Sequence, residues 1–198
     1  MKKTLLLIVV FVLLASPVWA GRAADRLLMV WPASGTACST LQQSNTNAEN
    51  NKALGDVAVN LYWAGKFTAT AYNVCKVEFY LKKVGNPNFN VNAYIYGHTG
   101  GTPGEPDETN VIATSTTTLV GDSLTTSYAW TPFENPDAAL SNGVTYWLVL
   151  KASGYHNSSN YVSISIDSVG SYQMANSSDG ATWTVNSAYI INYRTYSD

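Results

Sequence analysis

The stretch that decides the fold consists of two runs, KVEFYLKKV at residues 76–84 and NVNAYIY at residues 90–96, with the turn residues GNPN at 85–88 between them. In both runs every second side chain is apolar, which is the spacing of a strand with one buried face. The pattern therefore predicts a β-hairpin. Its core positions are Val77, Phe79 and Leu81, then Val91, Ala93 and Ile95, and its outer face carries Glu78, Tyr80, Asn92, Tyr94 and Tyr96.

Short runs of the same kind continue to the end of the chain, set off by Gly, Asn and Pro, and no helical period persists after residue 20. Residues 143–151 are apolar on both faces, which predicts a strand in the middle of a sheet. We expect an all-β fold of two antiparallel sheets packed face to face. A jelly-roll-like sandwich is the first choice, and a closed barrel or an immunoglobulin-type strand order stay open. The other predicted strands are residues 111–116, 125–131, 160–167, 171–176, 181–185 and 188–196.

The first 20 residues have the three parts of a secretory signal peptide. Lys2 and Lys3 precede an apolar run at residues 5–15, and small residues flank Trp19 before the expected cleavage after Ala20. The apolar run is shorter than the roughly 20 residues that cross a bilayer, and residues 193–198 have no hydrophobic tail or basic cluster. We expect a secreted protein without a stable membrane anchor, in which residues 21–52 form an N-terminal strand and polar loop and residues 53–198 form the sandwich.

Charge argues against nucleic acid as a partner. Loss of Lys2 and Lys3 with the signal leaves 9 of the 11 basic residues against 13 acidic ones, and no basic cluster remains. Nucleic-acid binding depends on such clusters.

Two cysteines, Cys38 and Cys75, remain in the mature chain. An even number of cysteines in an oxidising compartment predicts one disulfide, and the C-x-x-C spacing of a redox pair is absent. Two buried thiols are the alternative.

The apolar run Leu27, Leu28, Met29, Val30 and Trp31 stands apart from the later strands, and Pro32 and a polar, Asn-rich stretch at residues 42–52 follow it. We interpret these parts as a short strand and a long polar loop. The strand either completes its own sandwich or adds to the sheet edge of a neighbouring subunit.

Three stretches carry a resemblance to a known group: residues 77–87, residues 140–150, and residues 179–183 together with the closing strand at 189–196. Over residues 55–196 the chain resembles the exported β-sandwich domains called choice-of-anchor domains, and it is also similar to jelly-roll modules of bacterial surface proteins and phage tail proteins. The resemblance implies a noncatalytic surface, adhesive or carbohydrate-associated module. Residues 193–198 do not resemble the C-terminal anchor of the anchored members, so we do not expect attachment to a cell wall.

Aromatic side chains on the predicted outer face suggest a ligand-binding platform, because such rings can stack on sugars. The candidates are Tyr80, Tyr94 and Tyr96, with Trp63 or Trp130 as further members. Outward tyrosines are also common on strands for reasons of β-propensity alone. The platform therefore competes with a purely structural interpretation.

Oxygen ligands for calcium gather near one long loop, where Asp107, Glu108 and Asn110 follow each other, and Asp167 and Asp179 lie in or beside other loops. Calcium takes such ligands, although ordinary turn chemistry explains the same residues. No other cofactor is indicated. Zinc would require three or four nitrogen or sulfur ligands, which two histidines and two paired cysteines do not supply.

Catalytic patterns are weak. Gly121-Asp122-Ser123-Leu124 spells the nucleophile motif of one esterase family, but neither His98 nor His156 has the Asp three residues before it that this family uses. Glu78 and Glu134 are conceivable glycosidase carboxyls, but nothing in their spacing pairs them. We expect no enzyme, with a small secreted hydrolase as the distant alternative.

We predict a secreted, noncatalytic structural or adhesive protein of an extracellular layer, fibre or matrix that assembles through its N-terminal strand. Its partners would be further copies, other surface proteins or polysaccharide. The alternative function is carbohydrate binding by the tyrosine face. Asn157 and Asn176 begin N-glycosylation patterns, which matter only in a host that glycosylates.

Overall fold

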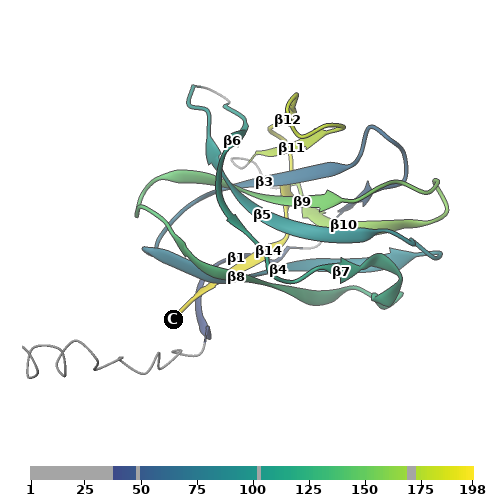
Figure 1. Cartoon of the computed structure of the whole chain (residues 1–198), viewed down its shortest axis with the longest axis horizontal. Helices are drawn as coiled ribbons and strands as arrows, with labels where there is room; N and C mark the ends of the chain where they lie inside the picture. The colour runs from purple at the N-terminus through teal and green to yellow at the C-terminus, as the bar shows by residue number, and fades with distance from the viewer. Residues whose placement is uncertain (1–37, 48–49, 102–103, 169–172) are drawn as a thin grey trace, which may run out of the picture. The chain divides into compact units, whose positions relative to one another are not determined.

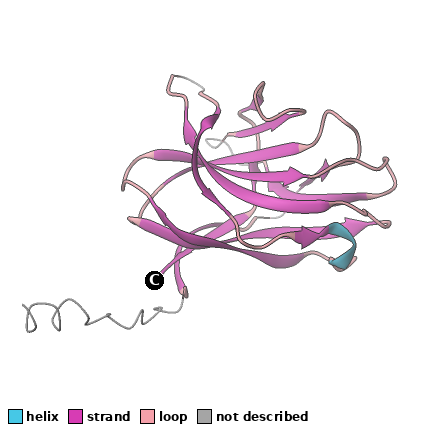
Figure 2. Cartoon of the chain, viewed as in Figure 1, coloured by secondary structure: helices cyan, strands magenta, loops and turns pink. Residues whose placement is uncertain are grey.

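Strands dominate the computed structural model, which describes residues 38–47, 50–101, 104–168 and 173–198 (Figures 1 and 2). These residues belong to one compact unit, Ala37–Asp198. A short 3-10 helix, Gly121–Ser123, is the one helical turn in this part of the chain. No helix with the length and apolar character needed to span a membrane occurs among the described residues. The predicted signal peptide and the strand predicted at residues 27–31 lie outside them.

One sheet, here called sheet A, is organised around β4 (Asn73–Val84). Along one side β4 pairs with β8, and along the other it pairs first with β14 and then with β10. β1 pairs with β14 and β2 with β10, so both lie further out. The remaining strands of sheet A are β1 (Thr40–Asn45), β2 (Asn50–Leu54), β8 (Ala129–Ala139), β10 (Tyr161–Asp167), β13 (Ile190–Ile191) and β14 (Tyr193–Ser197).

The second sheet, sheet B, has the order β12-β11-β3-β9-β5-β6, with β7 beside β5. Its central strand β9 is the run that is apolar on both faces, and Trp147, Leu148, Val149 and Leu150 are all at most 1% exposed. The predicted central position of this strand is confirmed. The strands of sheet B are β3 (Tyr62–Thr68), β5 (Asn90–His98), β6 (Pro106–Thr114), β7 (Leu119–Val120), β9 (Thr145–Ala152), β11 (Met174–Ser177) and β12 (Thr184–Asn186).

The main core lies between the two sheets (Figure 1). Phe79 of β4 packs edge to face on Phe133 of β8, with ring centroids 5.8 Å apart, and both side chains are fully buried. Ile95 and Leu148 of sheet B belong to the same apolar cluster. Every described strand pairing is antiparallel, and successive strands repeatedly change sheets. The predicted all-β, jelly-roll-like sandwich is therefore confirmed.

The predicted hairpin is wrong, because β4 and β5 belong to different sheets. Residues 85–89 cross from sheet A to sheet B. Gly85 has a φ of +62°, and the Asn86 amide donates to Asn160 Oδ1 at 2.7 Å, which fixes the crossing to the start of β10. The apolar faces of β4 and β5 thus meet across the core instead of side by side. Consequently their outer faces lie on opposite sides of the sandwich.

The polar stretch at residues 42–52 is also not a loop, since most of it belongs to β1 and β2. Both strands lie outermost in sheet A, where solvent is available to their side chains, and main-chain pairing with β14 and β10 holds them. Hydrophobic alternation is not needed at such a position. The sandwich therefore begins near residue 37 and not at residue 53.

The disulfide between Cys38 and Cys75 is present, with the two Cα atoms 5.9 Å apart. It joins Cys38, two residues before β1, to Cys75 of β4, and β14 runs between these two strands. The predicted pairing is confirmed, and it is consistent with an oxidising compartment.

Candidate functional site

The outer face of sheet A carries a continuous set of aromatic and charged side chains. Alternate residues of β4 point outward, and the register places Tyr80 opposite Trp130, Glu78 opposite Arg194, and Lys76 opposite Tyr196. All these side chains are half-buried. We call the following set the aromatic row: Lys76, Glu78, Tyr80, Lys82, Tyr128, Trp130, Arg194 and Tyr196.

Three rings form the middle of the aromatic row. The centroid of the Tyr80 ring lies 5.2 Å from that of Tyr128, with an interplanar angle of 25°, and 4.9 Å from that of Trp130, with an angle of 31°. These are offset-stacked geometries that aromatic pairs favour. Tyr128 is fixed further by a 2.7 Å hydrogen bond between its hydroxyl and Ser163 Oγ. Burial raises the pKa of Tyr128, so its hydroxyl stays protonated.

A cation lies over each of three rings in the row. Lys82 Nζ is 4.6 Å from the Tyr128 centroid, the Arg194 guanidinium carbon is 4.0 Å from the Trp130 ring, and Lys76 Nζ is 3.9 Å from the Tyr196 ring. Such contacts each contribute about 0.5–1 kcal/mol at exposed sites. The rings are therefore held in place by neighbours on several strands.

Glu78 joins the charged end of the row. Its Oε2 accepts a hydrogen bond from the Tyr196 hydroxyl at 2.8 Å and lies 3.6 Å from Arg194 Nη1, and its Oε1 lies 3.3 Å from Lys76 Nζ. Burial raises the pKa of Tyr196, and the hydrogen bond to the Glu78 carboxylate raises it further. This carboxylate thus pairs with two cations and accepts a hydrogen bond from one ring hydroxyl.

The aromatic row has the chemistry of a contact surface. Tyrosine, tryptophan and arginine side chains are the types that carry most of the binding energy in protein interfaces. Here they stand on one face of sheet A and are already ordered by stacking and by ion pairs. Little conformational entropy would be lost when a partner covers them.

The five residues predicted as one ring platform do not come together. Tyr80 and Trp130 are neighbours on sheet A, and Tyr94 and Tyr96 are neighbours on sheet B, with ring centroids 5.6 Å apart. Trp63 points into the core, where its indole N–H donates to the Ala53 carbonyl at 2.8 Å. Tyr94 and Tyr96 lie on the outer face of sheet B, because β5 is not paired with β4.

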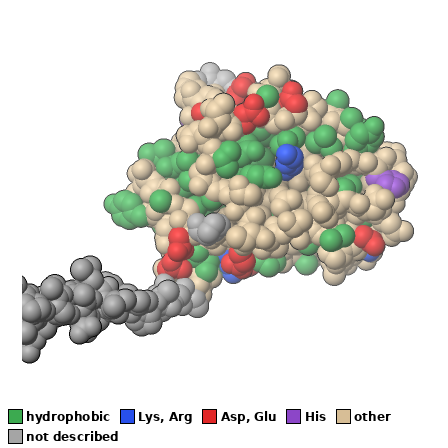
Figure 3. All heavy atoms as spheres, viewed as in Figure 1, with side chains coloured by type: hydrophobic (Ala, Val, Ile, Leu, Met, Phe, Trp, Pro, Cys, Tyr) green, Lys and Arg blue, Asp and Glu red, His purple; other side chains and the backbone are tan. Residues whose placement is uncertain are grey.

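The outer face of sheet B holds a second apolar cluster, which is mostly buried. Tyr62 meets Trp183 edge to face with centroids 6.0 Å apart, and Trp147 is fully buried. Burial raises the pKa of Tyr96 to about 12, and the neighbouring tyrosines and Glu108 add to the shift. Figure 3 shows apolar side chains gathered over the strands of sheet B, with acidic side chains along the upper rim. Because these rings are largely covered, they offer less surface than the aromatic row.

The predicted calcium ligands lie within β6, where the pairing with β5 shifts register between Asp107 and Val111. Asp107 Oδ1 accepts hydrogen bonds from the Thr109 amide at 3.0 Å and the Thr109 hydroxyl at 2.6 Å. Asn110 packs against Gly97, where an added Cβ would lie 2.2 Å from the Asn110 amide nitrogen. Glu108 lies beside them on β6.

The two other predicted oxygen ligands for calcium, Asp167 and Asp179, lie outside β6. Asp179 Oδ1 accepts from the amides of Ala181 and Thr182, and these backbone hydrogen bonds lower its pKa. Asp167 is buried at the end of β10. In the described part of the chain the one group of three metal-ligating side chains is Cys38, Cys75 and Asp198, and its two sulfurs are joined in the disulfide.

The esterase-like motif forms the 3-10 helix after β7. Ser123 Oγ donates to the Val120 carbonyl at 2.6 Å, and Asp122 pairs with Lys83 at 2.7 Å. His98 is hydrogen-bonded to Trp147, and His156 is hydrogen-bonded to Asn157. In the described part of the chain, Ser123 Oγ thus has a backbone carbonyl and not a histidine as its hydrogen-bond partner. Glu78 belongs to the aromatic row, and Glu134 is exposed on β8.

Sequence reasoning missed Tyr128, Arg194, Tyr196, Lys76 and Lys82 as members of one surface. One local signal was available, because Tyr128 and Trp130 are two residues apart and therefore share a face of an extended chain. The pairing of β4 with β8 and β14, which are distant in sequence, left no such signal.

Comparison with models of known protein families finds no match, and no curated protein sequence matches the chain. The resemblance to choice-of-anchor domains stays a prediction.

Proposed function

We propose that the chain is a secreted, noncatalytic protein that works through its surface, as a structural or adhesive component of an extracellular layer, fibre or matrix. The observation that carries this proposal is the aromatic row, in which eight half-buried aromatic and charged side chains stand together on the outer face of sheet A. The core of the sandwich does not require these rings, since it lies on the other side of sheet A.

The disulfide supports the same proposal. It ties the start of the described domain to β4, the strand that supplies half of the aromatic row. Such links form and persist in the oxidising compartments that secreted proteins occupy.

The test measures adhesion of the mature chain, residues 21–198, to surfaces coated with extracellular proteins and to insoluble polysaccharides. We expect Tyr80→Ala and Trp130→Ala to weaken adhesion at least about tenfold, as hot-spot residues do. Tyr72→Ala and Tyr155→Ala are matched controls, because these tyrosines are 75% and 58% exposed and lie outside the row. Equal adhesion of all four variants would contradict the proposal.

Carbohydrate binding is the second candidate, favoured by the position of Tyr80 and Trp130 beside hydroxyl and charged groups of the same row. A glycan array separates the two functions. Glycan binding that Trp130→Ala abolishes would identify the row as a sugar site. Adhesion to protein surfaces with an empty array would leave the structural or adhesive role.

A further inference from the structure

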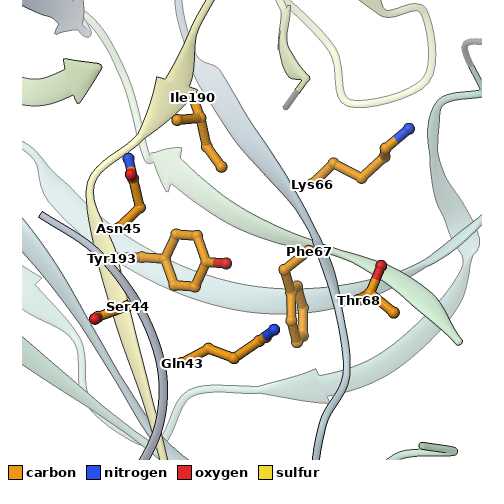
Figure 4. A pocket seen from close by; sticks show the side chains of 8 residues that line it. All are labelled: Gln43, Ser44, Asn45, Lys66, Phe67, Thr68, Ile190 and Tyr193. Atoms are coloured by element: carbon orange, nitrogen blue, oxygen red, sulfur yellow. The ribbon is translucent and has the colours of Figure 1, made fainter. Parts of the chain in front are cut away.

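A pocket of about 550 Å³ opens between the two sheets beside β1 (Figure 4). Its floor and walls combine apolar and polar side chains. Phe67 of β3 and Tyr193 of β14 contribute rings whose centroids are 6.2 Å apart, and Ile190 of β13 adds an aliphatic side chain. The volume is in the range of sites that hold ligands or protein side chains.

An acceptor without a partner lies in this pocket. Gln43 Oε1 is buried and has no hydrogen-bond partner within the described part of the chain. Its residue stands opposite the inward-facing Thr195, and its side chain points toward Phe67 in Figure 4. Buried polar atoms are rarely left unpaired in native proteins, so this oxygen indicates that a donor is missing.

Unpaired main chain flanks the same pocket. β1 is the last strand on its side of sheet A, and no described strand pairs with it opposite β14. On sheet B, β11 pairs with β3 along Tyr62–Gly65, and the Lys66 amide donates to the Gln173 carbonyl at 2.9 Å. Among the described residues, no pairing on that side reaches Thr68, which also lines the pocket. A free strand edge beside an open pocket is the acceptor geometry for strand addition.

Both faces of the acceptor edge are suited to an apolar strand. A strand beside β1 would direct alternate side chains into the pocket, toward Phe67 and Ile190, and the others onto the outer face of sheet A. On that outer face Leu41 is 51% exposed. Residues 27–31 are apolar at every position, so both of their faces match, and their main-chain amides would supply donors near Gln43.

The disulfide determines which copy supplies the strand. It holds Cys38 beside β4, and β14 separates β4 from β1. The chain therefore enters the domain on the inner side of β1, whereas the free edge faces the other way. A segment of the same chain would have to pass around the start of β1 to reach this edge, within the six residues that separate Trp31 from Cys38. A second copy meets no such restriction.

We propose that the free edge of β1 and the pocket beside it receive residues 27–31 of a second copy of this chain. This inference rests on the proposed structural function and names the partner for assembly. Because the donor strand and the acceptor edge are different surfaces, the contact is heterologous, and it propagates into rings or fibres.

The experiment measures the mass of the mature chain by light scattering over a wide range of concentration. We expect oligomers that grow with concentration, and a monomer after deletion of residues 21–35. Val30→Glu in the intact mature chain should abolish assembly, while Ser34→Glu, which lies outside the donor segment, should not. A mature chain that stays monomeric throughout, or a deletion variant that still assembles, would overturn the proposal.

The acceptor is tested separately with a labelled peptide of residues 26–32 added to the deletion variant. We expect saturable binding that Thr68→Trp abolishes by filling the pocket mouth. Thr126→Trp is the control, since Thr126 is also exposed but lies before β8. Peptide binding that survives Thr68→Trp would place the acceptor elsewhere and refute this assignment.

The outcomes separate this inference from the adhesive function. Adhesion is measured on the monomeric deletion variant, in which the aromatic row is intact. If the deletion variant no longer assembles but still adheres, the deleted segment is required for assembly and not for adhesion. If Trp130→Ala still assembles and its adhesion is unchanged, the aromatic row is refuted as the adhesive surface and the strand-addition proposal stands.

Discussion

The indole N–H of Trp147 donates a hydrogen bond to Nδ1 of His98 at 3.0 Å. Trp147 is fully buried on the outer side of sheet B, and His98 is the last residue of β5. Burial lowers the pKa of His98, and the charge of Lys66 lowers it further. The neutral imidazole is thus the form that satisfies the buried indole.

We expect the protein to lose stability in mild acid because of this pair. Below pH 6.5, the ordinary pKa of histidine, the unfolded chain binds a proton at His98 more readily than the folded chain does. The free energy of unfolding therefore falls as the pH decreases from 6.5 toward the lowered pKa of the folded state. Denaturant titrations at several pH values measure the slope. His98→Gln should reduce it and the exposed His156→Gln should not; an unchanged slope in His98→Gln would contradict this expectation.

Two buried asparagines should respond oppositely to the same substitution. Asn135, 4% exposed, has no hydrogen-bond partner for either amide atom within the described chain. Asn192 is fully buried, and its amide bonds to Asn45, Ser165 and the Asn47 carbonyl. We expect Asn135→Leu to raise the free energy of unfolding by about 1 kcal/mol, and Asn192→Leu to lower it by about 3 kcal/mol, because only the second leaves partners unpaired. Chemical denaturation measures both changes. If both variants lose the same free energy of unfolding, the Asn135 side chain has hydrogen-bond partners, contrary to this prediction.

Removal of the disulfide should destabilise the domain. The bridge closes a sequence separation of 37 residues, which corresponds to about 4 kcal/mol on a chain-entropy model. We expect Cys38→Ala/Cys75→Ala to lower the free energy of unfolding by roughly that amount, and to speed amide hydrogen exchange first in β1. A uniform rise in exchange over all strands would argue against a local role for the bridge.

Glu78→Gln tests the charged end of the aromatic row. The substitution keeps an acceptor for Tyr196 but removes the charge that faces Lys76 and Arg194. We expect a loss of about 1 kcal/mol in the free energy of unfolding, near the upper end for surface ion pairs. The pKa of Tyr196 should fall, because the Glu78 carboxylate raises it. A pH titration of tyrosinate absorbance measures the pKa, and the same titration of Tyr196→Phe identifies the contribution of Tyr196. An unchanged pKa in Glu78→Gln would refute the coupling between Glu78 and Tyr196.

Much of the fold could be predicted because the alternation of apolar and polar residues is visible within each single strand. Val77, Phe79 and Leu81 are all buried as their spacing predicts, and the two-faced apolar run of β9 is central. The partner of each strand could not be predicted. The turn residues at 85–88 suit a tight reversal within one sheet and a crossing between sheets equally well, and only the rest of the fold selects the crossing.

The same ambiguity about strand pairing made the predicted grouping of the site residues wrong. Tyr80 and Tyr94 share a face only if β4 and β5 pair, and in the structure they lie on opposite outer faces. The neighbours that Tyr80 acquires are Trp130 of β8 and Tyr128, the residue just before β8, about 50 residues later in the chain. Local pattern identifies outward rings, but long-range pairing determines which rings meet.

The Cys38–Cys75 bridge also sets how the domain would carry tension. A pull on the chain before Cys38 passes through the covalent bond directly to β4, the strand paired with β8, β10 and β14. β1, β2 and β3 lie inside the closed loop between the two cysteines and are bypassed by the force. A copy held by its N-terminal segment would therefore keep β1 seated on β14 under load, with its outer edge still available to the next copy.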